Sequence, residues 1–180
     1  NKLISLHVKG YVVSTGLDNA MPAYRAITLA AANLTKYNLT TLGFEADNTS
    51  QFLLGPVLAS LNYGGEYYHD SVKTKDQTGY EGSTPSGGRG VGSAFTQLAR
   101  NWKIVQLPGA LRYDTYQASG SGVNEASGFT SVNAGAFSAS RGADAVNPKV
   151  TLAVTPVHGL QLYGSYGLGF RPPAVTEMFM

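Results

Sequence analysis

The stretch KLISLHVKGYVVS, residues 2–14, alternates between apolar and polar side chains along almost its whole length. Successive side chains of a β-strand point to opposite faces of its sheet, whereas a helix repeats every 3.6 residues. A strand here would place Ile4, Leu6, Val8 and Val12 on one face, and Ser5, His7, Lys9 and Tyr11 on the other. A period of two over so many residues therefore predicts a β-strand.

The same alternation recurs along the chain and predicts seven strands in all. The further stretches are residues 40–52, 57–70, 91–100, 104–116 and 148–156, and a last one from Leu160. Residues 91–100 alternate poorly, and we assign a strand there because the neighbouring strands need a return path. Pro108 lies inside one stretch, where we expect a bulge or a sheet edge because proline lacks the N–H that a ladder needs.

The connections between these strands alternate in length. Short turns are expected at Leu53–Pro56, Arg100–Trp102 and Pro156–Gly159, and long polar loops at Thr15–Lys36, Thr74–Gly90 and Ser119–Ala145. The glycine-rich GGRGVG, Gly87–Gly92, lacks the Lys-Ser/Thr pair of a phosphate-binding loop and is expected in a flexible outer loop. Short turns on one side and long loops on the other are typical of outer-membrane β-barrels.

The charged residues of the predicted strands all fall on the polar face: Lys9, Glu45, Asp47, Glu66, Arg112, Asp114 and Lys149. An Arg or Lys facing lipid at mid-depth costs about 2–4 kcal/mol, so we expect these side chains to line a watery lumen. Tyr63, Tyr67, Tyr113 and Tyr166 punctuate the apolar face, as interfacial aromatics do, and Trp102 lies at a short turn. The predicted fold class is all-β: a segment of an antiparallel transmembrane β-barrel. A soluble β-sandwich or jelly roll alternates in the same way and remains the alternative.

Composition narrows the classes of function. Charged residues make up 13% of the 180 residues, about half the usual share, and the net charge of +2 gives no support for a nucleic-acid partner. The chain has no cysteine, which excludes disulfides and thiolate metal sites. Neither a Ser/His/Asp set nor a metal-spaced histidine pair is present, so we expect neither catalysis nor an intrinsic metal or cofactor.

The C-terminal part of the sequence resembles a known family. VNPKVTLAVTPVHGLQLYGSYGLGFRPPAVTEMF, residues 146–179, is similar to a segment of TonB-dependent outer-membrane receptors, in the branch that takes haem, haemoglobin or hemophores. FRPPA, Phe170–Ala174, resembles the FRAP box of that family, with Pro172 where alanine is typical. Leu42–Phe52, Leu61–Asp76 and Leu107–Gly122 are similar to successive strands of the same branch, in order.

This resemblance implies a 22-stranded barrel filled by an N-terminal plug, with import driven by the TonB complex acting on the plug. Residues 1–180 would then be part of the barrel domain, without the plug and without the C-terminal end of the barrel. The implied location is the bacterial outer membrane, with its lipid as one partner. The implied cargo is haem, a haemoprotein or a siderophore, with haem as a transported ligand.

The resemblance also places the ligand-binding loop directly after the FRPPA motif, so Phe170 and Arg171 are candidate ligand-binding residues. Arg171 can pair with Glu177 and hold the loop, or it can meet an anionic group such as a propionate, because guanidinium binds carboxylates in bidentate fashion. His69, beside Tyr67, is expected near the outer rim, and haem iron can be held by His or Tyr. His7 is expected to be a polar lining residue.

Three functions remain open from the sequence. The first is a TonB-dependent transporter of haem or another iron chelate. The second is a passive porin or adhesin barrel, in which lumen charges tune permeation. The third is a soluble β-sandwich that binds carbohydrate with its tyrosine-rich face.

Overall fold

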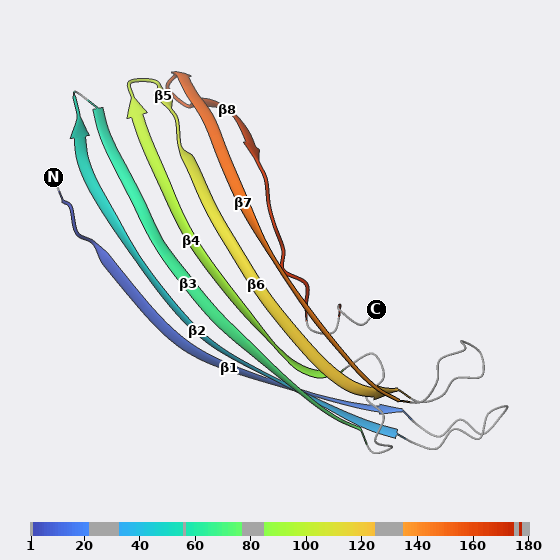
Figure 1. Ribbon diagram of the computed structural model, residues 1–180. Helices are drawn as coiled ribbons and strands as arrows, with labels where there is room; N and C mark the ends of the chain where they lie inside the picture. The colour runs from blue at the N-terminus through green and yellow to red at the C-terminus, as the bar shows by residue number, and fades with distance from the viewer. Residues whose placement is uncertain are drawn as a thin grey trace.

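The structure is a computed structural model, and it describes residues 2–21, 33–55, 57–76, 85–124, 135–174 and 177. Its strands are β1 (Leu6–Met21), β2 (Asn33–Leu54), β3 (Val57–Asp76), β4 (Ser86–Trp102), β5 (Val105–Gln106), β6 (Gly109–Asn124), β7 (Gly135–Val157) and β8 (Leu160–Gly167) (Figure 1). Every pairing between them is antiparallel.

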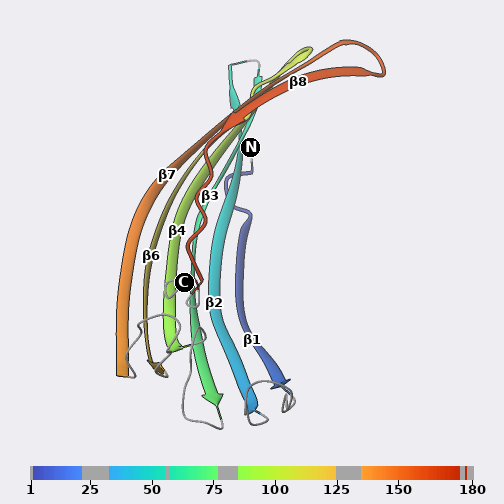
Figure 2. The ribbon, with the colours of Figure 1, turned by 90° about the vertical axis from the view of Figure 1, so that its right-hand side faces the viewer.

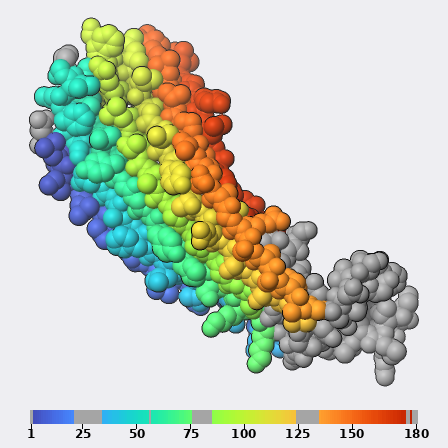
Figure 3. Space-filling view, viewed as in Figure 1, coloured from blue at the N-terminus to red at the C-terminus, as the bar shows by residue number. Residues whose placement is uncertain are grey.

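These strands form one curved sheet in which chain neighbours are also neighbours in space. The order runs from β1 through β2, β3 and β4, then β6 with the short β5 beside it, then β7 and β8. Figure 2 shows the bow of the sheet, and Figure 3 shows its strands side by side as one continuous layer. The described residues contain no helix of the length and apolar character needed to cross a bilayer.

Strand register assigns each side chain to one of two faces. Lys9 pairs with Glu45, Glu45 with Glu66, Glu66 with Ser93 and Ser93 with Asp114, so these side chains share what we name the polar face. By the same register, all seven charged residues singled out in the sequence lie on this face. The opposite face, here called the apolar face, carries a belt of exposed side chains: Leu6, Val8, Val12, Leu42, Phe44, Tyr63, Tyr67, Leu111, Tyr113, Val146, Val150, Leu152, Leu162 and Tyr166.

Burial distinguishes the two faces away from the β2–β3 turn, near which Val57 and Ala59 of the apolar face are themselves buried. On the polar face Asp70 is 6% exposed and Tyr116 is 8% exposed, whereas on the apolar face Leu42 is 59% exposed and Tyr67 is 54% exposed. Side chains converge on the inner side of a bowed sheet and spread apart on the outer side. The polar face is therefore the crowded, inner one, and no other part of the chain that the structure describes covers the belt of large apolar side chains.

The strands are longer than the sequence pattern predicted. The loops expected at Thr15–Lys36, Thr74–Gly90 and Ser119–Ala145 were predicted too long. The strands extend into all three: β1 continues to Met21, β2 begins at Asn33, β3 continues to Asp76 and β7 begins at Gly135. Beyond the apolar belt the outer face becomes polar or small, and Val72, Val91 and Tyr116 lie on the inner face instead, so the simple alternation of the belt ends while backbone pairing continues. The GGRGVG stretch is likewise in β4, not in a loop.

The short turns correspond more closely to expectation. β2 and β3 are joined at Gly55, whose φ is 64°, and β7 and β8 at His158–Gly159, where Gly159 has a φ of 86°. The turn predicted at Arg100–Trp102 falls two residues later, because β4 runs to Trp102 and Lys103 takes the positive φ. The strand predicted over 104–116 is divided into β5 and β6 at Leu107–Pro108, so the structure has eight strands where the sequence predicted seven.

A backbone contact gives a test of this packing. A Cβ added at Gly64 would lie 2.4 Å from the carbonyl oxygen of Ala46 and 2.7 Å from the Cβ of Asp47, so β2 and β3 must separate to accept it. We expect Gly64→Ala to destabilise the folded protein by about 1–3 kcal/mol, as overpacking does. The measurement is the urea midpoint of the full-length protein in detergent. The matched control is Gly164→Ala in β8, whose added Cβ meets nothing within 4 Å; equal midpoints for the two variants would contradict this packing.

Candidate functional site

A buried ion pair lies on the polar face, towards the end of the sheet where β3 ends and β4 begins. Arg89 of β4 donates from Nε and Nη2 to Oδ2 of Asp70 in β3, at 3.0 and 2.5 Å. The Asp70 side chain is 9% exposed and that of Arg89 16% exposed. Thr41 of β2 donates to the other carboxylate oxygen of Asp70 at 2.7 Å, and the guanidinium lies 5.6 Å from the ring centroid of Tyr68.

The remaining donor of Arg89 reaches the C-terminal segment of the chain. Its Nη1 donates to the carbonyl oxygens of Pro173, at 2.9 Å, and Pro172, at 3.3 Å. Prolines have no N–H to offer a strand ladder, yet their carbonyls remain strong acceptors. Figure 2 shows the segment after β8 running across the sheet, and these bonds fix where it crosses β4.

An apolar contact holds the start of that segment. The ring of Phe170 lies 5.8 Å from the ring of Tyr116 in β6, tilted by 33°. Phe170 packs against a small buried cluster of Val72, Val91, Tyr116 and Ala118, drawn from β3, β4 and β6. Phe170–Ala174 is therefore seated on the polar face by one aromatic contact and one arginine.

Arg171 points away from that seat. Its side chain is 75% exposed, and Nη2 donates to Glu177 at 2.9 Å. Glu177 also accepts the backbone N–H of Ala174 at 2.7 Å. These two hydrogen bonds, that from Arg171 first, lower the pKa of the Glu177 carboxyl below its ordinary value. The ion pair considered from the sequence is present, and the Arg171 side chain is largely exposed while it forms that pair.

A second charged cluster lies further along the polar face. Arg112 donates from Nε to Asp114 at 2.7 Å and from Nη2 to Ser93 at 2.8 Å, and it also pairs with Glu66. Asp114, 5% exposed, accepts from Ser93 at 2.6 Å and from Asn147 at 2.7 Å. One arginine and two carboxylates from β3 and β6 thus form one network that crosses to β7, with excess negative charge.

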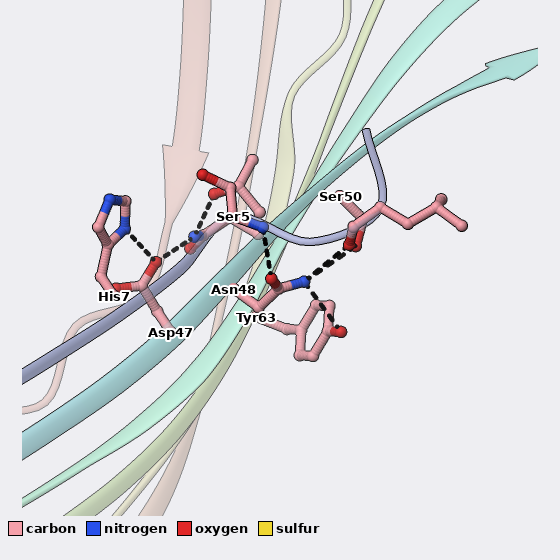
Figure 4. A network of polar contacts seen from close by, with 9 residues as sticks. Ser5, His7, Asp47, Asn48, Ser50 and Tyr63 are labelled. Atoms are coloured by element: carbon pink, nitrogen blue, oxygen red, sulfur yellow. Dashed lines mark hydrogen bonds and ion pairs between the residues drawn. The ribbon is translucent and has the colours of Figure 1, made fainter. Parts of the chain in front are cut away.

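A third polar group lies near the N-terminal edge. Asn62 donates to Asp47 at 2.9 Å and to Thr49 at 3.0 Å, and His7 lies 3.5 Å from the same carboxylate. Figure 4 shows His7 and Asp47 together, with Asn48 bonding to Ser5 and the Tyr63 hydroxyl alongside. Among the described residues, Lys9, Glu45 and Lys149 form no ion pair within the chain, and Lys9 lies 5.2 Å from the ring of Tyr11.

The four candidate ligand-binding residues are not brought together. Phe170 and Arg171 belong to the segment that crosses the polar face. Tyr67 and His69 lie on the apolar face, because His69 pairs with Leu42 and Gly90 in the same register row. The sheet itself separates the two pairs of side chains.

Arg89 and Asp70 are the functional candidates that sequence reasoning missed. Treating GGRGVG as a loop removed Arg89 from consideration, because a loop residue has no assigned face. Extending the alternation back from Ser93 and Val91 would have placed Arg89 on the polar face. The pair is a structural clamp, and the described residues contain no group of three or more metal-ligating side chains.

The comparisons with known proteins agree with this architecture. A family model described as TonB dependent receptor-like, beta-barrel, matches residues 7–180. The chain belongs to this family. It is a stretch of antiparallel barrel wall, and the resemblance stated from the sequence is confirmed.

Individual members of the receptor family are similar over most of the chain. A protein named hemin receptor from Yersinia pestis is 32% identical over 146 residues, and one of the same name from Yersinia enterocolitica is 31% identical over 144 residues. Each match covers 78% of this chain and 18% of the relative, so the chain spans about a fifth of the length of these receptors.

A solved receptor structure matches almost the whole chain. It is a double mutant of the Serratia marcescens hemophore receptor HasR in complex with its hemophore HasA and heme, with a TM-score of 0.79 and 29% sequence identity. The match covers 98% of this chain and 29% of that one.

The clamp gives a direct prediction. Arg89→Ala leaves Asp70 buried without its cation and removes both hydrogen bonds to the proline carbonyls, and breaking a buried pair costs about 3–5 kcal/mol. We expect faster amide hydrogen exchange over residues 168–174 and over the C-terminal part of β3, around Asp70, in the full-length receptor. The control is Arg100→Ala, an exposed arginine on the same strand with no ion pair among the described residues. Unchanged exchange in Arg89→Ala would show that the segment is held by other contacts.

Proposed function

We propose that the chain forms part of the wall of a TonB-dependent outer-membrane receptor that imports haem, or another iron chelate, without altering it chemically. The observation that supports this most is the match to the hemophore receptor over nearly the entire chain, together with two similar proteins named hemin receptors. The location proposed is the bacterial outer membrane. The partners proposed are its lipid, the TonB complex and a haem or haemoprotein ligand.

The two faces fit a wall between lipid and water. The apolar belt meets hydrocarbon, and the polar face, with Lys9, Glu45, Asp47, Glu66, Arg112, Asp114 and Lys149, meets the lumen. From Val57, where β3 begins, to Tyr67 the strand is about as long as a membrane-crossing strand of roughly 9–11 residues. Tyr67 and Tyr113 then lie at an interface, where the amphipathic phenol ring is favoured.

The lengths of the strands and of their connections indicate which end of the sheet faces the periplasm and which faces the outside. The short connections at Gly55, Lys103–Ile104 and His158–Gly159 lie at one end, which we assign to the periplasm. At the other end β2, β3, β6 and β7 continue well beyond the apolar belt, and we assign this end to the outside. The Arg89–Asp70 clamp and Phe170–Ala174 then lie towards the outer mouth of the lumen, on the side from which a ligand arrives.

Phe170 and Arg171 are the proposed ligand-side residues in this arrangement. Phe170 is seated against Tyr116, so it fixes the segment, while the exposed Arg171 guanidinium offers donors to an anion. A haem propionate is a carboxylate that such a guanidinium binds in bidentate geometry. Tyr67 and His69 face away from the lumen and do not join this ligand site.

Import is tested with the full-length receptor in a bacterium that cannot synthesise haem and has no other haem receptor. We expect growth on haem when TonB is present and none when TonB is deleted, because an energised receptor needs the complex to release its ligand. In a second arm, an iron-starved strain that makes its own haem and has no other siderophore receptor is given a ferric siderophore in place of haem, which distinguishes the two cargoes. Uptake that persists without TonB, or steady ionic conductance in planar bilayers without an energy source, would identify a passive pore instead.

The role of Arg171 in haem binding is tested by comparing a variant of Arg171 with a variant of Glu177, its ion-pair partner. If the guanidinium binds a ligand carboxylate, Arg171→Ala loses a charge-assisted hydrogen bond of about 1.5 kcal/mol and weakens haem binding roughly ten-fold. Glu177→Gln removes the carboxylate that pairs with Arg171 on the exposed surface, where ion pairs contribute little, and leaves the guanidinium itself in place. Haem titration of the purified full-length receptor, followed by absorbance, measures both variants. Equal effects would assign Arg171 to loop structure alone.

A further inference from the structure

One register row on the polar face carries an arginine that the clamp does not use. Asp70 of β3, Arg89 of β4, Ala118 of β6 and Arg141 of β7 pair in succession, so their side chains share this face at one height. Arg89 and Arg141 therefore lie two ladders apart, about 10 Å across the sheet, with only the methyl group of Ala118 between them. We name these four residues the arginine row.

The arginine row holds more positive than negative charge. The carboxylate of Asp70 accepts from Arg89 and from Thr41, so the clamp neutralises one arginine. Asp114, the other buried acid of this face, accepts from the arginine of the second cluster. Arg141 is exposed, and it forms no ion pair with any residue that the structure describes.

The immediate neighbours of Arg141 offer it no carboxylate. On β7 the adjacent side chains of the same face are Ala139 and Ala143, and across the β6–β7 ladder Arg141 pairs with Ala118. Asp144 follows Ala143 directly and therefore points to the apolar face, because successive side chains of a strand alternate. The Arg141 guanidinium is thus available to an anion that arrives through the lumen.

The FRPPA segment, Phe170–Ala174, crosses the arginine row beside Arg141. Phe170 packs against the buried cluster that contains Ala118, and the carbonyls of Pro172 and Pro173 accept from Arg89. Arg171 lies between these two contacts, with its side chain 75% exposed. Two exposed guanidiniums therefore flank the ring of Phe170, one on the wall and one on the segment.

This arrangement matches a ligand with two carboxylates on one edge of a flat apolar body. Each guanidinium is a planar fork that binds a carboxylate through two parallel hydrogen bonds. The partly buried ring of Phe170 lies between the two forks and offers apolar surface to the body of the ligand. A ligand with a single carboxylate would leave one of the two guanidiniums unused, whereas haem carries two propionates on one edge of its macrocycle.

We infer that Arg141 and Arg171 each bind one propionate of haem, so that the propionate edge faces the wall at β6 and β7 and the opposite edge points into the lumen. Arg141 is then a specificity-determining residue that selects ligands with two free carboxylates. This inference rests on the proposed function, to which it adds the second carboxylate contact and the orientation of the cargo.

The test is titration of the purified full-length receptor with haem and with haem dimethyl ester, in which both propionates are methylated. The ester keeps the iron and the macrocycle but has no carboxylate for a guanidinium to bind. We expect the unmodified receptor to bind haem about a hundred-fold tighter than the ester, since each contact contributes roughly ten-fold. Arg141→Gln should lose about ten-fold affinity for haem and none for the ester, and adding Arg171→Ala should abolish the remaining preference.

Lys149→Gln is the matched control. Lys149 is an exposed cation on the same strand and the same face as Arg141, and it forms no ion pair with the described residues. We expect this variant to keep the full preference for haem, which separates direct contact from general attraction of an anion. Variants are compared on the same ligand, so that partition of the ligand into detergent cancels.

Two results would overturn the inference. One is an undiminished preference for haem over the ester in Arg141→Gln, which would show that Arg141 meets no propionate. The other is an equal loss of affinity for haem and for the ester in this variant, which would make Arg141 a structural residue.

Growth on haem separates this inference from the proposed function. A receptor that shows the expected preferences in titration but supports no TonB-dependent growth on haem would contradict the transport function and leave both contacts intact. TonB-dependent growth on haem, with a preference that Arg141→Gln does not change, would contradict only the role of Arg141. A receptor that binds neither haem nor its ester would overturn both.

Discussion

The described part of the chain is a single curved sheet with only a small buried cluster, and this constraint governs the molecule. Each face must match the medium that it meets, because within the described ranges no second layer covers the sheet. Over the length of the apolar belt, the segregation of ionised side chains onto one face and large apolar side chains onto the other is therefore the dominant energetic feature. A shift of one residue in any strand pairing would exchange the two faces of that strand, so the alternation also enforces the register.

The polar face must accommodate charged side chains that are crowded together and largely buried. Asp70 and Asp114 are almost fully buried, and each accepts hydrogen bonds from an arginine and from a hydroxyl group. Burying such groups is tolerable only when their hydrogen bonds are complete. The Arg112 cluster links β6 to β3, β4 and β7, and the Arg89 clamp links β4 to β3 and to the C-terminal segment.

Strand identity, face assignment and family could be predicted from the sequence because a period of two is a local property. The strand ends could not, since beyond Tyr67 and Tyr113 the apolar face becomes polar and a few apolar residues such as Val72 and Val91 lie on the other face, so the alternation no longer marks a strand while the ladder goes on. Arg89 was missed for the same reason, as the glycines around it resemble a loop. The contact between Phe170 and Tyr116 joins residues far apart in the chain, and such a contact cannot be predicted from a local sequence pattern. Pro108, by contrast, was correctly expected to disturb its strand.

The geometry of Arg89 has a consequence for how the FRPPA segment can move. Two of its nitrogens are committed to Asp70, while a different nitrogen holds the proline carbonyls. The segment can therefore lift from the wall while Asp70 keeps its cation, and detachment breaks the two hydrogen bonds to the proline carbonyls and the packing of Phe170 against its buried cluster. Because the tether holds main-chain oxygens, side-chain changes at 172 and 173 that keep the backbone path would leave it in place.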